Sequence, residues 1–259
     1  MNAPPIIKGM LFDLDGVLYV GSQVIDGSIE VVNKVRASGM PCRFITNTST
    51  LSLASLERKI KALGFDIPRH EIISAPQAAL LYLSGKNDPV CRLLLADDVK
   101  QDFSELRQSD TDAQFIVIGD IGDRWSYSLL NEVFNNLMNG ARLIAIHKNR
   151  FWQTENGLQM DIGGFIEALE YTSSTHAMII GKPAPAFFQM ALSSMGLAAQ
   201  DVAIIGDDID ADVGGGQNAG LQGILVKTGK YRQSHAEKSN VLPYYVINSI
   251  KELPNLLRL

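Results

Sequence analysis

Residues 6–19 read I-I-K-G-M-L-F-D-L-D-G-V-L-Y, and the rest of the chain is interpreted outward from them. Their first half is an apolar run typical of a buried strand, and the run ends at Asp13 and Asp15, just before Gly16. Two carboxylates at the end of a buried strand repel each other and lose hydration, so folding alone gives little reason to place them there.

These two acids have a functional and a structural interpretation. In parallel α/β sheets, ligands bind at the carboxyl ends of the strands. A hard cation such as Mg²⁺, held by carboxylates and a bound phosphate, would keep both acids charged. The sequence D-x-D-G is equally typical of a turn, so this stretch alone leaves turn and site open.

Bulk composition excludes several classes of protein. Hydrophobic residues make up 46% and charged residues 20%, as in an ordinary globular protein of one large or two moderate domains. A net charge of −5 without any basic block argues against nucleic-acid or anionic-membrane binding. Cys42 and Cys91 form no C-x-x-C motif, and we find no signal peptide and no apolar run that could span a bilayer, so we expect a cytoplasmic protein.

Strand-like and helix-like segments alternate along both ends of the chain. After the first strand we predict a helix over 26–39, a strand at Cys42–Thr46 and a helix over 53–63. The pattern resumes late, with predicted strands at 178–181, 202–205, 223–226 and Tyr245–Ile247, and with helices over 185–196 and 250–257. Such repeated βα units predict a doubly wound, mostly parallel sheet with helices on both faces.

The middle of the chain predicts a second, smaller α/β domain. Its expected strands are 90–96, 114–119 and 141–147, and its expected helices are 98–108, 126–139 and 163–171. We therefore predict a core of residues 1–76 and 180–259, interrupted by an inserted domain over residues 77–179.

Polar residues follow the predicted core strands at their ends. They are Asp13 and Asp15, Thr46 and Asn47, Lys182, and Asp207 and Asp208 with Asp212. Each group has an ordinary explanation as a helix cap, a turn or a solvated lysine. Because such strand ends converge on one crevice, their combination matches what phosphoryl transfer needs.

Three consecutive glycines, residues 214–216, lie where the pattern predicts a helix. Each glycine costs about 1 kcal/mol relative to alanine in a helix interior. Such a cost is expected where the backbone approaches something closely or at a functional site, and a flexible loop is the alternative.

Four motifs in this order resemble those of the haloacid dehalogenase superfamily: D-L-D-G-V-L, T-N-T, G-K-P and G-D-D-x-x-x-D. The insertion resembles the α/β cap of its NagD-like subfamily. Three further stretches, A-I-H-K-N-R-F-W, G-F-I-E-A-L-E-Y and I-G-K-P-A-P-A-F-F, are similar to the group of phospholysine phosphohistidine inorganic pyrophosphate phosphatases and their hydrolase relatives.

The resemblance implies a Mg²⁺-dependent phosphatase acting through an aspartyl-phosphate. Asp13 would be the nucleophile, and Asp15 would protonate the leaving oxygen and then deprotonate water. The expected substrate is a small phosphate monoester, a pyrophosphate or an N-phosphorylated group. The core reads only the phosphoryl group, so the insertion would choose the substrate.

The remaining site residues are assigned by the same resemblance. The Asp13 carboxylate, the Asp15 backbone carbonyl and Asp207 would hold Mg²⁺, with Asp208 and Asp212 orienting the metal or its waters. Thr46 and the Asn47 backbone would bind phosphoryl oxygens, and Lys182 would offset negative charge.

The insertion contributes one basic cluster, formed by His147, Lys148 and Arg150. His147 and Arg150 could contact an anionic substrate, or the cluster could be a solvated loop face. Caps of this kind often pair, so the resemblance makes a homodimer one expectation. The alternative function is a non-hydrolytic phosphate-binding or receiver-like signalling protein, although a receiver would need no insertion.

Overall fold

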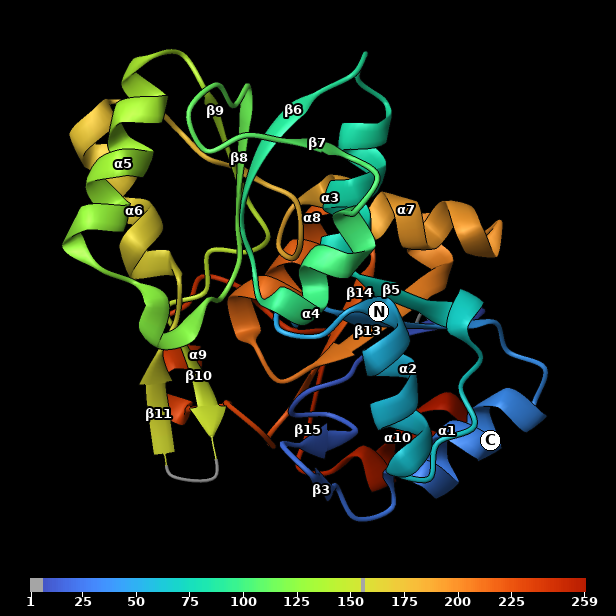
Figure 1. Ribbon diagram of the computed structural model, residues 1–259. Helices are drawn as coiled ribbons and strands as arrows, with labels where there is room; N and C mark the ends of the chain where they lie inside the picture. Colours follow the sequence, from blue (N-terminus) through green and yellow to red (C-terminus); the bar gives the residue numbers. More distant parts are fainter. Residues whose placement is uncertain (1–6, 155–156) are drawn as a thin grey trace.

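Two parallel β-sheets carry the fold in the computed structural model, which describes residues 7–154 and 157–259 (Figure 1). The larger, core sheet has the strand order β15-β14-β13-β1-β4-β5, and every neighbouring pair is parallel. Its strands are β1 (Gly9–Asp13), β4 (Cys42–Thr46), β5 (Ile72–Ser74), β13 (Val202–Gly206), β14 (Gln222–Val226) and β15 (Tyr245–Ile247). The strand order runs outward in both directions from β1, which confirms the predicted doubly wound sheet.

Helices cover both faces of the core sheet. On one face the helices are α1 (Ser28–Ala37), α2 (Leu53–Ala62) and α10 (Leu253–Leu257), and on the other α3 (Ala75–Ser84), α7 (Pro185–Met195) and α8 (Gly215–Asn218). Val31 and Val35 show why α1 packs as it does. They lie one helical turn apart, so both side chains enter the same apolar cluster.

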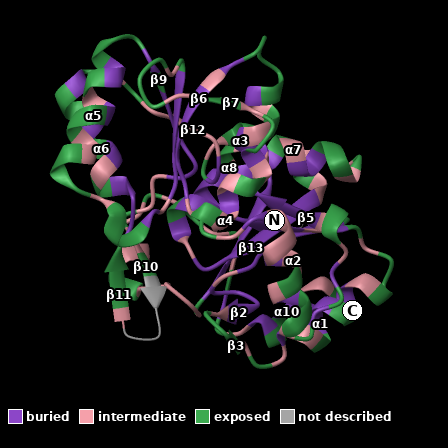
Figure 2. Cartoon of the chain, viewed as in Figure 1, coloured by how far each residue is buried: buried purple, intermediate pink, exposed green. Residues whose placement is uncertain are grey.

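The second sheet has the order β12-β9-β8-β6-β7, again parallel throughout. Its strands are β6 (Val90–Leu94), β7 (Arg107–Gln108), β8 (Phe115–Ile118), β9 (Arg142–Ala145) and β12 (Met178–Ile179). Helices α5 (Tyr127–Met138) and α6 (Gly163–Ser173) cover its outer face (Figure 1). Figure 2 shows the strands largely buried and the outward faces of these helices exposed.

One apolar cluster joins the two sheets. It contains Ile204 of β13, Val117 of β8 and Ala79 of α3, among others. Hydrogen bonds reinforce this contact. Asp98 belongs to the layer formed by the second sheet and its helices, called the second layer below, and it accepts the Ser52 N–H at the start of α2 at 2.6 Å. The division of the chain at residues 76/77 and 179/180 stays a prediction, since α3 contributes to the core that both sheets share.

Short elements complete the described chain. Two hairpins pair β2 (Tyr19–Val20) with β3 (Gln23–Val24) and β10 (Phe151–Thr154) with β11 (Gly157–Met160), and short helices are α4 (Asp97–Lys100) and α9 (Gln233–Ala236). Single turns of 3₁₀ helix lie at Arg69–Glu71, Gln101–Phe103, Gly122–Arg124, Ala199–Asp201 and Ile250–Glu252, and a π-helical turn at Ile209–Gly214. None of the described helices has the length and apolar character needed to cross a membrane.

Two expectations about individual elements are wrong. The predicted helix over 98–108 ends early, and β7 instead pairs with β6 and forms an edge of the second sheet, with Val90 opposite Arg107. An unpaired sheet edge offers backbone hydrogen bonds that outweigh a weak local helix preference. The strand at Met178–Ile179 does not resume the core pattern, because it pairs with β9 of the second sheet.

Candidate active site

The carboxyl ends of three core strands meet at one cleft. Asp13 is the last residue of β1, Thr46 is the last residue of β4, and Asp207 follows β13 directly. All three line the cleft, together with Asp15, Asn47 and Lys182. The structure therefore places the predicted nucleophile, acid, phosphate-binding residues and lysine around one space.

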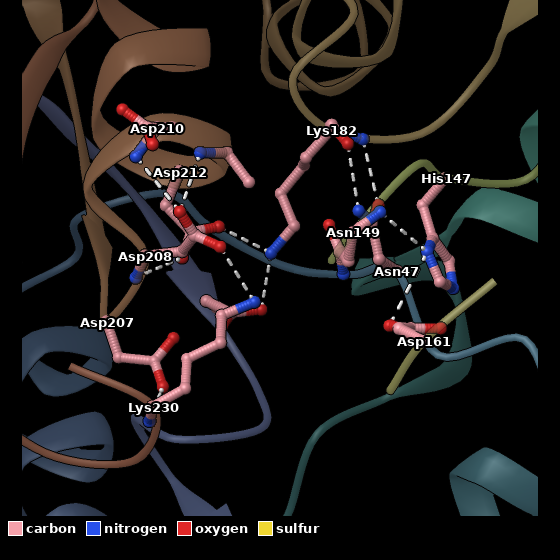
Figure 3. A network of polar contacts seen from close by, with 12 residues as sticks. Asn47, His147, Asn149, Asp161, Lys182, Asp207, Asp208, Asp210, Asp212 and Lys230 are labelled. Atoms are coloured by element: carbon pink, nitrogen blue, oxygen red, sulfur yellow. Dashed lines mark hydrogen bonds and ion pairs between the residues drawn. The ribbon is translucent and has the colours of Figure 1, made fainter. Parts of the chain in front are cut away.

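Lys182 joins two buried acids at the bottom of this cleft. Its Nζ lies 2.5 Å from Asp13 Oδ1 and 2.6 Å from Asp212 Oδ1 (Figure 3). Burial, helped by the nearby Asp212, raises the pKa of Asp13 to about 7 although Lys182 opposes the shift. Burial alone would lower the pKa of Lys182, but the two carboxylates outweigh it and raise that pKa above its ordinary value. Lys182 therefore remains a cation in the site.

The Asn47 side chain fixes the backbone of Lys182. Its Nδ2 donates to the Lys182 carbonyl at 2.9 Å, and its Oδ1 accepts the Lys182 N–H at 2.8 Å. Thr46 Oγ1 lies 2.8 Å from Thr48 Oγ1 and accepts the Thr48 N–H at 3.0 Å. The side chain of Asn47 is thus a positioning group, which the sequence did not indicate, and the phosphate-binding role of its backbone stays a prediction.

Three acids are close enough to share a cation. Carboxylate oxygens of Asp13, Asp207 and Asp212 all lie within 4.8 Å of one another. Within the described residues, Asp207 Oδ1 is buried and has no hydrogen-bond partner, and burial raises the pKa of Asp207 well above its usual range. Such an oxygen fits a divalent cation, because hard cations prefer carboxylate ligands.

Two glycines leave room for the Asp207 carboxylate. A side chain on Gly16 or Gly229 would collide with this carboxylate, and both residues have positive φ angles, of 91° and 54°. Only glycine adopts this backbone conformation without strain and without a Cβ in the way. The glycine of the D-L-D-G motif is therefore required by the geometry around the acids.

Asp208 holds the backbone behind the cleft. Its Oδ1 accepts the N–H groups of Asp210 and Ala211, each at 2.9 Å, and so caps the turn Ile209–Gly214. Its Oδ2 lies 2.9 Å from Lys230 Nζ. Burial raises the pKa of Asp208, but Lys230 and these backbone donors outweigh burial and bring it to about 2.

Lys230 is a site residue that the sequence analysis missed. Its N–H donates to Asp207 Oδ2 at 2.6 Å, and its side chain lines the cleft beside Asp208. The segment K-T-G-K follows β14 directly. Lys230 therefore lies close to the end of a core strand, as Asp13 and Asp207 do, and its position after β14 is the sequence signal that could have identified it.

Residues of the second layer close the cleft from the opposite side. His147 is buried there, its Nε2 lies 3.4 Å from Ser49 Oγ, and burial lowers its pKa. Arg150 is exposed and lines an adjoining cleft instead of this one. Lys148 lies 2.8 Å from Glu167 and 2.6 Å from Glu170, so these acids match its charge. Of the predicted basic cluster, only His147 lines the cleft that contains Asp13.

Comparisons with known proteins decide the family. A model of haloacid dehalogenase-like hydrolases matches residues 10–108, and a second model of HAD-like hydrolases matches residues 179–253. The bovine haloacid dehalogenase-like hydrolase domain-containing protein 2 is 41% identical over 244 residues, which are 94% of this chain and 93% of that protein. The chain belongs to the haloacid dehalogenase-like hydrolase family. It is therefore a hydrolase, as the four motifs predicted.

Two further relatives of this hydrolase cover almost its whole length. Phospholysine phosphohistidine inorganic pyrophosphate phosphatase of Xenopus laevis is 34% identical over 97% of this chain and 94% of its own. The solved p-nitrophenyl phosphatase from Archaeoglobus fulgidus superposes with a TM-score of 0.90 at 28% identity, covering 98% of this chain and 100% of its own. Both matches span the two sheets, which confirms the predicted resemblance over nearly the whole hydrolase.

Proposed function

We propose that this hydrolase is a Mg²⁺-dependent phosphatase that acts on a small phosphorylated substrate through an aspartyl-phosphate on Asp13. The observation that carries the proposal is the position of Asp13. It is buried at the bottom of the cleft, contacts Lys182, and lies close enough to Asp207 and Asp212 to share a cation with them. The names of its phosphatase relatives support the same reaction class.

Substrate binding would use the positive groups of the cleft. Lys182 would offset the charge that the phosphoryl group shares with Asp13, and Thr46 with the Asn47 backbone would bind the phosphoryl oxygens. Mg²⁺, held by the carboxylates of Asp13 and Asp207 and the Asp15 carbonyl, would supply positive charge beside those oxygens. Asp212 would orient this arrangement through Lys182, and Asp208 would do so through its cap on the backbone.

The chemistry would then need one nucleophile and one acid. Asp13 attacks phosphorus, the bond from phosphorus to the leaving oxygen breaks, and Asp15 gives its proton to that oxygen. Burial raises the pKa of Asp15, although several lysines oppose the shift, and this favours its protonated form. Asp15 next takes a proton from water, the water oxygen attacks phosphorus, and Asp13 is released.

The test uses p-nitrophenyl phosphate with Mg²⁺ or with EDTA, beside Asp13→Asn. We expect turnover with Mg²⁺, loss of turnover in EDTA, and a fall of at least about 10³-fold in kcat for Asp13→Asn. The exposed acid Asp112 supplies the matched control, because Asp112→Asn makes the same change outside the cleft. Turnover that survives EDTA or Asp13→Asn would contradict the mechanism.

The same experiment addresses the alternative function. A single stoichiometric phosphorylation without phosphate release would favour a receiver-like role over hydrolysis. The assay is repeated with a phosphate monoester, with pyrophosphate and with an N-phosphorylated amino acid, which represent the three expected classes of substrate. The homodimer stays a prediction, which the molar mass in solution would test.

A further inference from the structure

The side of the cleft that would face the leaving group carries acids and an aromatic ring. From the second layer, the cleft is lined by Asp120, His147, Asn149, Trp152 and Asp161. The two lysines that line it, Lys182 and Lys230, both come from loops of the core sheet. Figure 3 shows Asp161 and His147 across Lys182 from the acids Asp207, Asp208 and Asp212. A leaving group would therefore meet negative charge on this side.

Neither acid of this wall has a lysine or arginine partner in the part of the chain that the structure describes. Among the residues that the structure describes, neither Asp120 nor Asp161 lies within 4.0 Å of a lysine or arginine nitrogen. Asp120 Oδ1 accepts the Gly122 N–H at 2.8 Å. By contrast, both cleft lysines already have carboxylate partners in the core. The carboxylates of the wall therefore line the cleft without a lysine or arginine partner.

Asp161 is the more deeply buried of the two acids. It is 7% exposed, and its Oδ1 accepts the Ile162 N–H at 2.7 Å. Its Oδ2 lies 3.8 Å from His147 Nδ1, beyond hydrogen-bond distance, and that nitrogen instead accepts the Asn149 N–H at 3.4 Å. Burial lowers the pKa of His147 although Asp161 opposes the shift, and this favours the neutral ring. A largely buried carboxylate that lines a cleft without a lysine or arginine beside it favours a positively charged ligand group.

Trp152 provides the second component of such a site. Its side chain is 39% exposed and lines the same cleft. The negative face of an indole ring attracts cations, and tryptophan does so better than other aromatic residues. An aromatic ring and carboxylates that line the same cleft are an arrangement that suits ammonium groups.

We propose that the cleft selects phosphorylated substrates whose leaving group carries a positively charged ammonium, bound by Asp161 and Asp120 beside Trp152. The proposal rests on the phosphatase function proposed above and adds the substrate class. An anionic leaving group would instead place its charge against two carboxylates, which opposes binding. The exposed Arg150 does not offset this repulsion, because it lines the adjoining cleft.

A matched pair of substrates tests the proposal. Phosphocholine and 3,3-dimethylbutyl phosphate have the same shape, but a carbon replaces the charged nitrogen in the second. We expect kcat/KM for phosphocholine to exceed that for the neutral analogue by about tenfold. Because the two alcohols differ in reactivity, the decisive quantity is the change of this ratio between variants.

The variants are Asp161→Asn and Trp152→Leu, with Glu167→Gln as control. Asp161→Asn should lower kcat/KM for phosphocholine about tenfold more than for the neutral analogue, and Trp152→Leu about threefold more. Glu167 is exposed, lies on α6 and pairs with Lys148, so its change should leave the ratio as in the wild type. An unchanged ratio in both cleft variants, or a wild-type preference for the neutral analogue, would overturn the proposal.

The p-nitrophenyl phosphate assay separates the two levels of failure. If the wild type hydrolyses this ester but does not distinguish the matched pair, only the ammonium preference is wrong. If the wild type does not hydrolyse it with Mg²⁺, the phosphatase function fails, and the substrate class fails with it.

Discussion

Lys182 is the residue on which the charge balance of the cleft depends. Its ammonium contacts two buried carboxylates, so Lys182→Met would leave Asp13 and Asp212 without their cation. We expect kcat/KM for p-nitrophenyl phosphate to fall by at least about 10²-fold, because in the proposed mechanism the lysine would stabilise charge that develops at phosphorus. Steady-state kinetics at saturating Mg²⁺ would measure the loss.

Lys148 provides a matched control for the Lys182→Met substitution. It also contacts two carboxylates, those of Glu167 and Glu170, but on the side of the second layer. Lys148→Met should therefore change kcat/KM by no more than about twofold, because its ion pairs lie outside the cleft that contains Asp13 and partly exposed ion pairs contribute little to stability. Equal losses in the two variants would show that Lys182 acts on folding rather than on charge at the reacting phosphorus.

For single residues, the sequence could predict membership of the cleft only for those that lie at the ends of core strands. Asp13, Thr46 and Asp207 follow strands of one parallel sheet, and the ends of such strands lie on one edge. Asp161 could not be found in this way, because it begins the segment before α6 in the other layer. Its approach to His147 depends on how two distant loops pack, and no local pattern encodes that.

The glycines of α8 illustrate how packing outweighs helix propensity. A Cβ on Gly215 would lie 2.8 Å from Pro183 Cα and 2.9 Å from Phe188 Cε2, both too close. Gly215→Ala should thus destabilise the protein by about 1–3 kcal/mol despite the better helix propensity of alanine. Urea unfolding followed by circular dichroism would measure this change.

Gly164 in α6 provides the control for Gly215→Ala, because it is also a helical glycine. A Cβ there would lie 3.6 Å from Met160 Sδ, an ordinary contact, and the residue is exposed. Gly164→Ala should stabilise the protein by about 0.5–1 kcal/mol, since only the propensity term remains. Stabilisation by both substitutions would show that α8 does not need the close approach seen at Gly215.

Element prediction succeeded where one periodicity extends over several turns. The helices α1, α2, α5 and α7 could be predicted because apolar residues recur along one face of each. The hairpin strands of two residues, such as Tyr19–Val20, are too short to show a period. The segment 98–108 failed for another reason, because pairing with β6 decides its conformation.

The whole molecule depends on contacts between its two layers. Buried side chains of both sheets share one apolar cluster, and acids of the second layer bind the start of α2. The loop that carries Thr46 and Asn47 leads into this same helix. The position of the second layer and the geometry of Thr46 and Asn47 are therefore coupled through α2. Such a coupling could not be read from either half of the sequence alone.

The burial of acids at the cleft also affects global stability. The pKa of Asp13 rises to about 7, mainly through burial, and that of Asp207 rises by the same cause. Between pH 4 and 7 the folded protein thus keeps protons that the unfolded chain has released. Without a divalent cation, stability should fall as the pH rises through this window. The lowered pKa of His147 has the opposite effect, because it makes stability rise with pH. A variant of Asp13 is therefore needed to separate the contribution of the acids from that of His147.

Thermal unfolding in EDTA and in Mg²⁺, at pH 5 and pH 8, tests this expectation. In EDTA the wild-type Tm should be several degrees lower at pH 8 than at pH 5, and Asp13→Asn should reduce this difference. Mg²⁺ should raise the wild-type Tm more at pH 8, because it binds ionised carboxylates and stabilises only the folded state. An equal Mg²⁺ effect at both pH values would show that the cation does not bind these acids. A pH dependence unchanged by Asp13→Asn would place its origin in other groups.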